Sequence, residues 1–485
     1  MDKIIGRKDE KKKLAKILDS GEAEFLAIYG RRRVGKTFTI RESFKNKGLY
    51  FEVTGQKDAT FNEQLDNFHK TLHDIFKPVL PIQKPESWKE AFSFLTILVK
   101  LQPPEKNIIL FLDELPWLAT KRSGLLQALD YEWNSVWSRM NNLKLIVCGS
   151  AASWILEKLI HAKGGLYNRL TNTIHLKPFS IGESRLYLEK KGIHLTPVQL
   201  LELYMVMGGI PYYLRHVEKG QSATQIINSL CFQKDGLLFS EFNRLFKSLF
   251  DQSEIHYKII REIAKKRNGI LRDDLLQATG YASGGTFNKR LNELKESGFI
   301  DEFIPYGRKK KAFTIKIIDE YTLFFLTWID PLQSKSSTIS YNPNYWLNIA
   351  TGSSYRSWTG YAFEAICMKH IDRILAALEL ENLATGIGRW HFVPPKKSND
   401  TGAEIDLIID RVDNCINICE IKFSNKEYLI DKNYAKNLAN KISVFQEKTK
   451  TKKQIFLTMI TTYGVKQNIW SEELVASTVH LEQLF

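Results

Sequence analysis

Two glycines set five positions apart constrain this chain more than any other feature. Gly30 and Gly35 bracket three arginines and a valine, and Lys36 and Thr37 follow. A backbone that wraps around an anion with its N–H groups has no room for side chains at the two glycines, which also adopt the angles that such a turn needs. An apolar run at residues 25–29 precedes the turn, and a helical stretch follows it. The pattern predicts a strand, a phosphate-binding loop (P-loop) and a helix.

The residue types around this loop indicate a nucleoside triphosphate with its metal. The N-terminus of the helix faces the phosphates, Lys36 reaches the β- and γ-phosphates, and the Thr37 hydroxyl ligates Mg²⁺. We therefore expect ATP and Mg²⁺ as cofactors. The residues assigned to nucleotide binding are Gly30, Arg31, Arg32, Arg33, Val34, Gly35, Lys36, Thr37, Phe38 and Ser150.

A second apolar run ends in two acids. Residues 108–112 are continuously apolar and lead into Asp113 and Glu114, which indicates a buried strand with carboxylates at its C-terminal tip. We expect Asp113 to contact Mg²⁺. Glu114 would be catalytic, together with Lys36, by orienting the water that attacks the γ-phosphate. The alternative for Glu114 is an exposed acid at a strand end.

Two further polar residues are candidates for the same reaction. Ser150 follows the apolar run at residues 143–148, where it would sense the γ-phosphate or, alternatively, cap a helix. Arg169 is a candidate catalytic residue that stabilises transition-state charge, within its own chain or from a neighbouring subunit of a homo-oligomer. An ordinary surface arginine is the competing interpretation.

The pattern of apolar segments predicts an α/β chain with four domains. Residues 1–180 alternate apolar strands with helices, which favours a parallel sheet covered on both faces. Residues 181–250 read as helical. Residues 251–330 read as three short helices and two strands around a turn rich in lysine, the outline of a winged helix-turn-helix. Residues 345–485 return to an α/β pattern after a polar linker.

The charge of the chain favours an anionic partner. Lys and Arg total 69 against 54 Asp and Glu, a net charge of +15, and nucleic acid is the commonest partner of so basic a protein. The alternatives for the winged-helix segment are a solvated hairpin tip and a domain that contacts other protein domains. Its candidate DNA-binding residues are Lys289, Arg290, Arg308, Lys309, Lys310 and Lys311.

The C-terminal part contains a second set of carboxylates. Asp406 lies on an expected strand, and the returning strand places Glu420 and Lys422 on one face. Two carboxylates can hold Mg²⁺, and the Lys422 ammonium would be catalytic by orienting water or steadying phosphorane charge. Glu364, from a helix expected at residues 361–374, would complete the metal site. The alternative is an ordinary solvated strand face.

Three motifs give the chain a family resemblance. It resembles archaeal and bacterial P-loop ATPases of the AAA+/STAND type in Ile5-Gly6-Arg7, Asp113-Glu114-Leu115-Pro116-Trp117 and Gly208-Gly209-Ile210-Pro211. The resemblance implies an ASCE-type parallel-sheet ATPase domain, a helical lid that begins near residues 208–211, a winged helix and a C-terminal restriction-endonuclease-like domain. Asp406, Glu420 and Lys422 are similar to the PD-(D/E)xK nuclease core, but no proline precedes Asp406.

These features predict an ATP-hydrolysing ATPase that acts on DNA through a winged helix and a Mg²⁺-dependent nuclease-like domain. One alternative is an ATP-driven signalling or regulatory switch whose nuclease-like domain is not catalytic; another is a DNA-binding regulator without hydrolysis. The apolar runs fall far short of the ~20 residues that cross a membrane, and the five cysteines form no CxxC pair. We therefore expect no membrane partner and a cytoplasmic location.

Overall fold

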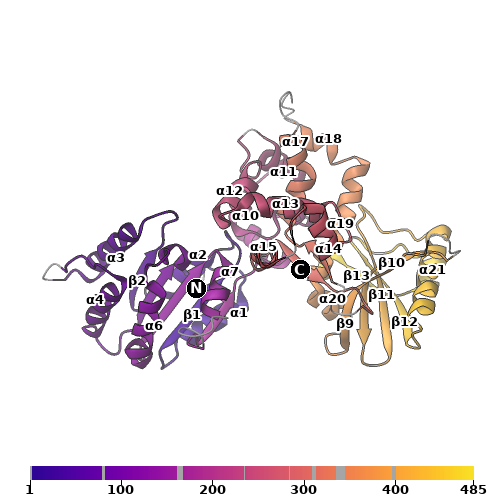
Figure 1. Cartoon of the computed structure of the whole chain (residues 1–485). Coiled ribbons are helices and arrows are strands. Elements are labelled where there is room, and N and C mark those ends of the chain that lie inside the picture. The colour runs from indigo at the N-terminus through magenta and orange to yellow at the C-terminus, as the bar shows by residue number, and fades with distance from the viewer. Residues whose placement is uncertain are drawn as a thin grey trace. The chain divides into compact units, whose positions relative to one another are not determined.

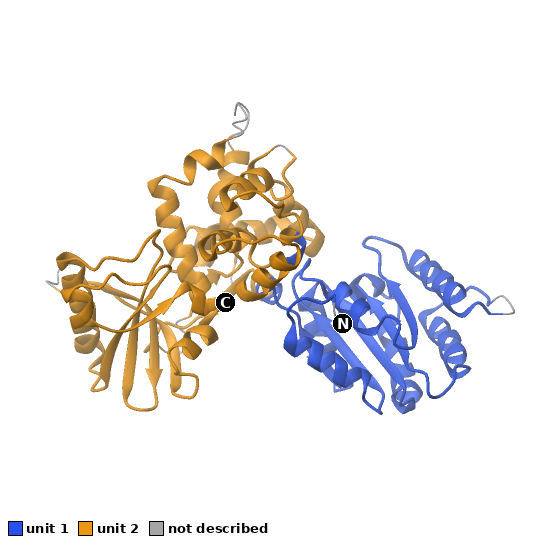
Figure 2. Cartoon of the chain, turned by 180° about the vertical axis from the view of Figure 1, so that it is seen from behind, with its two compact units in different colours: residues 1–179, 210–212, 292–298 blue, residues 180–209, 213–291, 299–485 orange. Residues whose placement is uncertain are grey.

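The computed structural model divides the chain into two compact units. Unit 1 comprises residues 1–179, 210–212 and 292–298, and unit 2 comprises residues 180–209, 213–291 and 299–485 (Figure 2). The residues that the structure describes are 3–78, 82–160, 168–233, 235–282, 284–308, 313–334, 344–395 and 400–485.

Unit 1 is built on a five-stranded sheet in which every pair of neighbouring strands is parallel. The strand order is β2-β3-β4-β1-β5, which is typical of a P-loop AAA+ domain. Every residue of the two central strands β3 and β4 is buried, as expected for a parallel sheet with helices on both faces. The strands are β1 (Glu24–Tyr29), β2 (Leu49–Thr54), β3 (Ile108–Asp113), β4 (Leu143–Gly149) and β5 (Asn172–His175).

Helices surround this sheet, and their starts follow from local capping (Figure 1). Helix α3 begins at a capping box in which Thr60 and Glu63 exchange hydrogen bonds, and α4 begins where Ser87 accepts from the Glu90 N–H. The larger helices are α1 (Lys8–Leu18), α2 (Lys36–Phe44), α3 (Phe61–Phe76), α4 (Trp88–Lys100) and α6 (Leu125–Ser135), and the short ones are α5 (Leu115–Leu118), η1 (Trp137–Arg139), α7 (Ala152–Ile155) and η2 (Leu156–Ile160).

A helical region follows, as the sequence predicted, and it is interrupted at the Gly-Gly-Ile-Pro motif. Helix α9 ends at Met207 because Gly208 and Gly209 both take left-handed angles, with φ of 61° and 68°. A Cβ on Gly208 would lie 2.4 Å from a carboxylate oxygen of Glu320, so a side chain at this position would require Glu320 to shift. The helices are α8 (Ile181–Lys190), α9 (Pro197–Met207), α10 (Pro211–Leu214), α11 (Ala223–Phe232) and α12 (Glu241–Leu249).

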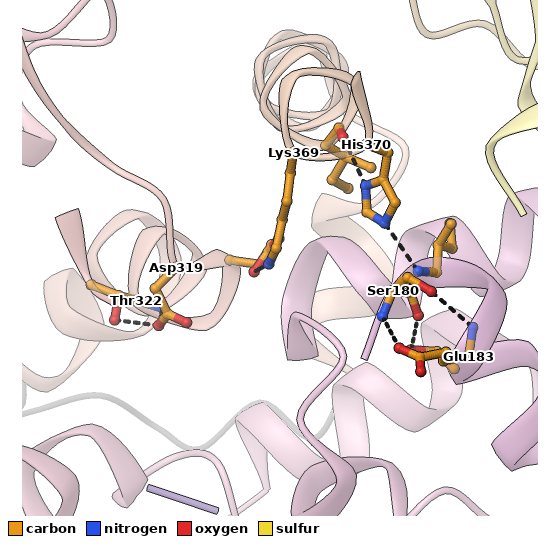
Figure 3. Close-up of polar contacts among 10 residues, drawn as sticks. Ser180, Glu183, Asp319, Thr322, Lys369 and His370 are labelled. Carbon is orange, nitrogen blue, oxygen red and sulfur yellow. Dashed lines mark hydrogen bonds and ion pairs between the residues drawn. The ribbon is translucent and has the colours of Figure 1, made fainter. Parts of the chain in front are cut away.

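Buried polar contacts tie this region to the C-terminal part of unit 2. His370 Nε2 accepts from the Ile181 N–H at 3.1 Å while its Nδ1 donates to the Ile366 carbonyl at 2.9 Å (Figure 3). Lys369 forms an ion pair with Glu320 at 2.7 Å. His370 and Glu320 are buried, whereas Lys369 reaches Glu320 from an exposed position. The two contacts join Ile181 of α8 and Glu320 to the C-terminal helices at defined points.

The next segment contains the three helices and two strands that the sequence predicted for a winged helix. A two-residue strand, β6, was not predicted; it completes an antiparallel sheet of order β6-β8-β7. Its elements are α13 (Ser253–Ala264), β6 (Ile270–Leu271), α14 (Arg272–Thr279), α15 (Gly285–Glu296), β7 (Ile300–Phe303) and β8 (Thr314–Ile317), and four short helices follow: α16 (Glu320–Phe324), η4 (Phe325–Ile329), α17 (Asp330–Ser334) and α18 (Tyr345–Ile349).

The C-terminal part is a mixed sheet with helices. Its strand order is β13-β12-β11-β10-β9; β9, β10 and β11 are antiparallel neighbours, whereas β11, β12 and β13 run parallel. The helix predicted at residues 361–374 is wrong in its bounds, because the chain breaks at His370 into two helices. The elements are α19 (Ser353–Lys369), α20 (Ile371–Ala377), β9 (Ala384–Phe392), β10 (Ala403–Arg411), β11 (Cys415–Lys422), α21 (Lys432–Thr449), β12 (Gln454–Thr461), α22 (Ile469–Leu474), β13 (Val475–His480) and η5 (Leu481–Leu484).

No helix among the described residues combines the length and the apolar character that crossing a membrane requires.

Candidate functional site

The P-loop connects β1 to α2 through a tight turn. Gly30, Arg33 and Gly35 all have positive φ, at 140°, 73° and 96°. A Cβ on Gly30 would lie 2.3 Å from the Leu176 carbonyl oxygen, so only glycine fits there. The turn starts α2 directly at Lys36, which places the positive end of the helix dipole at the loop.

Lys36 is buried and points back across this loop. Its Nζ donates to the carbonyl oxygens of Gly30 and Arg31, at 2.9 and 3.1 Å, and to Ser150 Oγ at 3.3 Å. All three acceptors are neutral, and no carboxylate in the described part of the chain forms an ion pair with Lys36. The ammonium is therefore held in place by neutral acceptors, without a direct ion pair to a described carboxylate, as suits an incoming phosphate.

Thr37 and Asp113 meet where the loop faces the end of β3. The Thr37 hydroxyl lies 3.0 and 3.1 Å from the two carboxylate oxygens of Asp113. Burial, with a contribution from Glu114, raises the pKa of Asp113, so a nearby cation would stabilise its ionised form. A hydroxyl and a carboxylate are the hard oxygen donors that Mg²⁺ prefers, and these two residues fit the predicted metal role.

Glu114 is fixed in an uncommon conformation beside them. It has a φ of 48°, unusual for a residue other than glycine, at the turn that leads from β3 into α5. Its carboxylate accepts hydrogen bonds from the N–H of Ser150, at 2.9 Å, and from the Ser150 hydroxyl. Ser150 thus contacts both Glu114 and Lys36. It does not cap α7, which begins at Ala152 without a side-chain cap.

The other predicted nucleotide-binding residues surround the loop. Arg31 and Val34 are buried, whereas Phe38, on the first turn of α2, is half exposed. The Arg32 guanidinium lies 5.7 Å from the Trp117 ring centroid and that of Arg33 lies 4.2 Å from the Tyr212 centroid. Trp117 belongs to one of the motifs on which the family resemblance rests, and Tyr212 directly follows another, which ends at Pro211.

Arg7 supports the loop in a way that the sequence did not reveal. Its Nη2 donates to the Val34 carbonyl at 3.1 Å, and its Nη1 donates to the Lys177 carbonyl. Arg7 therefore links the N-terminal segment, the P-loop and the segment after β5. The Ile-Gly-Arg motif at residues 5–7 was the available signal, but no role had been assigned to it.

Arg169 is not brought to this site by any contact in the described residues. It lies in an exposed turn before β5 and forms no hydrogen bond or ion pair with a described side chain. Its predicted catalytic role stays a prediction.

The second candidate site lies on β10 and β11 of unit 2. Their antiparallel register sets Leu407 opposite Cys419 and so brings Asp406 next to Glu420. Asp406 accepts from the Ile421 N–H at 2.9 Å. Lys422 lies 2.7 Å from Glu420, on the same face of the strand as predicted.

Two residues on α21 also belong to this centre. Lys441 Nζ lies 2.7 and 2.9 Å from the two Glu420 oxygens, and the Tyr434 hydroxyl donates to Glu420 at 2.7 Å. We call Asp406, Glu420, Lys422, Tyr434 and Lys441 the carboxylate centre. Tyr434 and Lys441 were not predicted, because nothing in the local sequence marks α21 as the helix whose side chains reach Glu420.

Glu364 lies close enough to this centre to raise the pKa of Asp406. Its carboxylate also forms an ion pair with Arg389 at 2.9 Å, and its predicted role as a metal ligand stays a prediction. Across the described ranges, no three His, Cys, Asp or Glu side chains are grouped so that they could hold a metal ion.

The two carboxylates of this centre differ in protonation. Burial, together with Glu420 and Glu364, raises the pKa of Asp406 to about 7. Burial alone would also raise the pKa of Glu420, but Lys422 and Lys441 lower it below its usual value. Glu420 is thus ionised and matched by two ammonium groups, whereas Asp406 is the carboxyl that would gain from a further cation.

Three of the predicted DNA-binding residues are described: Lys289 and Arg290 lie on α15, and Arg308 follows β7. Lys289 and Arg308 are exposed, and Arg290 donates to Gln252 at 2.6 Å. Phe287, Leu291 and Leu294 form the buried face of α15, as predicted. Lys309, Lys310 and Lys311 lie outside the described residues.

Comparison with known proteins identifies a family match for the N-terminal part of the chain. Residues 5–217 match a family described as an ATPase domain predominantly from Archaea, and residues 328–438 match one described as archaeal and bacterial proteins of unknown function. The chain therefore contains a P-loop ATPase domain of this archaeal type, and such domains bind ATP with Mg²⁺.

Relatives of the whole chain are distant. The uncharacterized protein MJECL04 of Methanocaldococcus jannaschii is 26% identical over 407 residues, which cover 84% of each chain. The Walker-type ATPase PABY2304 of Pyrococcus abyssi has 21% identity and a TM-score of 0.48, covering 67% of this chain and 97% of that one. The Aeropyrum pernix ORC2 protein has 18% identity and a TM-score of 0.41, covering 68% and 95%.

Proposed function

We propose that unit 1 hydrolyses ATP at the site formed by Lys36, Thr37, Asp113, Glu114 and Ser150. The observation that supports this most directly is the meeting of Thr37 and Asp113, whose oxygens are 3.0–3.1 Å apart, beside Lys36, which forms no ion pair with a described carboxylate. Two hard oxygen donors next to an ammonium are what a metal-bound triphosphate requires.

In this proposal each residue has one task. Lys36 leaves its carbonyl partners for the β- and γ-phosphate oxygens, and the loop N–H groups and the start of α2 hold the remaining phosphate charge. Mg²⁺, when bound through Thr37 and Asp113, would neutralise charge on the phosphates. Glu114 orients the attacking water, and its hydrogen bonds to Ser150 position the carboxylate before the nucleotide arrives.

The test is the variant Glu114→Gln, with Glu105→Gln, an exposed acid before β3, as its matched control. We expect phosphate release to fall by roughly 10²–10⁴-fold while ATP affinity is retained, because only the water-orienting group is lost. The control should hydrolyse ATP at the wild-type rate. Normal hydrolysis by Glu114→Gln would show that the base has been assigned wrongly.

We also propose that unit 2 acts on DNA. The net charge of +15, the exposed Lys289 on the helix that a winged helix would use for recognition, and the exposed Arg308 support this proposal. In its enzymatic form, Asp406 and Glu420 would hold Mg²⁺, and Lys422 would steady charge on the cleaved phosphodiester. Mg²⁺ is commonly held by only one or two carboxylates together with substrate phosphates, so this pair fits the ion in number.

A specific observation favours the second candidate, a regulatory switch whose C-terminal domain binds without cleaving. Glu420 is already matched by Lys422 and Lys441 and bonded to Tyr434, and Glu364 is matched by Arg389. A metal at this centre would have to displace at least one of these ion pairs.

A cleavage assay distinguishes the two candidates. Wild type, Asp406→Ala and Lys422→Ala are incubated with plasmid and linear DNA in Mg²⁺ or Mn²⁺, with and without ATP. Nicking that both variants abolish supports the nuclease. Equal nicking by all three points to a contaminant, and DNA binding without cleavage by any of them supports the switch.

A further inference from the structure

Two histidines on α3 converge on one backbone oxygen. His69 and His73 are one helical turn apart, and their Nε2 atoms lie 3.2 Å from each other. The carbonyl oxygen of Ile82, from the segment that follows α3, lies 2.8 Å from His69 Nε2 and 3.3 Å from His73 Nε2. Three electron-pair donors therefore surround a single point on the surface of unit 1.

Hydrogen bonding alone satisfies this arrangement incompletely. The carbonyl can only accept, so a proton is needed on at least one Nε2. If both rings carry that proton, two N–H groups face each other at 3.2 Å; if one does, its single proton serves both the carbonyl and the other ring. A cation at the centre would serve all three donors at once.

The spacing also matches metal ligation. Two imidazole nitrogens bound to Zn²⁺ at ~2.0–2.1 Å with a tetrahedral angle are roughly 3.3–3.4 Å apart, close to the 3.2 Å between His69 and His73. Histidines at positions i and i+4 of a helix are a recurrent zinc-binding pair, because both rings project from one face.

We propose that His69, His73 and the Ile82 carbonyl bind a divalent late-transition-metal ion, of which Zn²⁺ is the best fit. Nitrogen donors suit Zn²⁺, Ni²⁺ and Cu²⁺ and are poor ligands for Mg²⁺, so this site is chemically distinct from the oxygen donors at Thr37 and Asp113. With two side chains and one carbonyl as ligands, water completes the coordination shell.

A metal bound here would join α3 to the residues around Ile82, which precede α4. An ion pair between Asp66 on α3 and Lys84 beyond Ile82 already joins the same two stretches. That pair is half exposed on both sides and contributes little by itself. A metal bridging α3 and Ile82 would close the loop more firmly, as cross-links that close a loop do.

Calorimetric titration of the full chain with ZnCl₂ tests this proposal. Excess Mg²⁺ is present throughout to occupy the oxygen sites. The variants are His69→Gln, His73→Gln and the double variant, and the matched control is His194→Gln, which removes an exposed histidine elsewhere in the chain. His69 and His73 are both partly exposed, so glutamine is tolerated there, and melting curves without metal check that each variant is folded.

We expect wild type and the control to bind one Zn²⁺ that the double variant does not bind, and each single variant to lose roughly tenfold or more in affinity. Zn²⁺ should also raise the melting temperature of wild type and not that of the double variant. Identical stoichiometry and affinity in wild type and the double variant would overturn the proposal. The proposal would also be overturned if a titration with MgCl₂ alone showed that the histidine pair binds Mg²⁺ as tightly as Zn²⁺.

Discussion

The P-loop site and the carboxylate centre are built from similar residues but treat charge in opposite ways. At the P-loop, the hydrogen bonds of Lys36 to described residues all go to neutral oxygens, and Asp113 accepts from a hydroxyl. In the carboxylate centre, Glu420 accepts from two ammonium groups and a phenol. At the first site the ammonium of Lys36 has no direct ionic partner among the described residues. At the second site the carboxylate of Glu420 is paired with two ammonium groups.

The two sites differ in the free energy of their buried charges. A buried ion that lacks an opposite charge costs free energy, and a site that maintains it is prepared for a charged ligand. A buried ion pair with good geometry has its attraction and its desolvation cost nearly balanced. Removing a lysine should therefore impair binding at the first site, and removing the shared carboxylate should impair stability at the second.

The largest effect on stability is expected from Glu420→Gln. It leaves Lys422 and Lys441 in a largely buried position without their anion, which costs roughly 3–5 kcal/mol. Hydrogen exchange of the β11 amides reports on this part of unit 2 and should show the loss. The control is Glu447→Gln, which breaks an exposed pair with Lys448 and should cost below about 1 kcal/mol. Equal protection in both variants would contradict the contrast between the two sites.

Lys36→Met should give the opposite result at the P-loop. ATP affinity should fall by roughly 10²-fold, because a charged hydrogen-bond donor to phosphate is worth about 1.5–3 kcal/mol. Thermal stability without nucleotide should change little, since the ammonium has no carboxylate partner to abandon. Equilibrium binding of labelled ATP and a melting curve measure the two quantities, with the exposed Lys45→Met as control. A large loss of stability with intact ATP affinity would refute the interpretation of this site.

Lys316, on β8, lies outside both sites and is largely buried without an ion pair to any described residue. Burial together with Arg389 lowers its pKa to about 7. Between about pH 7 and its unfolded pKa near ~10.4, the unfolded chain binds more protons than the folded one, so stability rises with pH. Lys316→Met should remove this rise and stabilise the chain at pH 7, by a few kcal/mol at most.

Melting curves of wild type and Lys316→Met from pH 7 to 10 test the sign of this effect. Lys289→Met, which removes an exposed lysine of the same segment, should leave the slope of stability with pH unchanged. A wild-type curve that falls across this window would mean that Lys316 is held as a stabilised cation.

Most strands of unit 1 could be predicted from local sequence. Continuous apolar runs predicted β1, β3 and β4, because strands of a parallel sheet buried on both faces are apolar throughout. β5 escaped prediction because, of Asn172, Thr173, Ile174 and His175, only Ile174 is apolar and buried. The strand is defined by its pairing with β1, which local composition does not encode.

The carboxylate centre shows the same limit. Strand alternation placed Glu420 and Lys422 on one face, as the 2.7 Å ion pair between them confirms. The contacts of Glu420 with Tyr434 and Lys441 depend on how α21 packs against the sheet. The ion pair of Glu364 with Arg389 likewise depends on the packing of α19. Sequence spacing contains no information on those distances.

By itself, the sequence determined the P-loop, its lysine and threonine, and the acids at the end of β3, because backbone angles and the chemistry of phosphate and metal restrict those positions to few residue types. Only the tertiary structure decided which charges meet: that Ser150 bridges Lys36 and Glu114, that Lys441 reaches Glu420, and that two histidines and a distant carbonyl converge. Electrostatic and metal-binding energies depend on distances of a few ångströms, and those distances are set by packing between elements far apart in the chain.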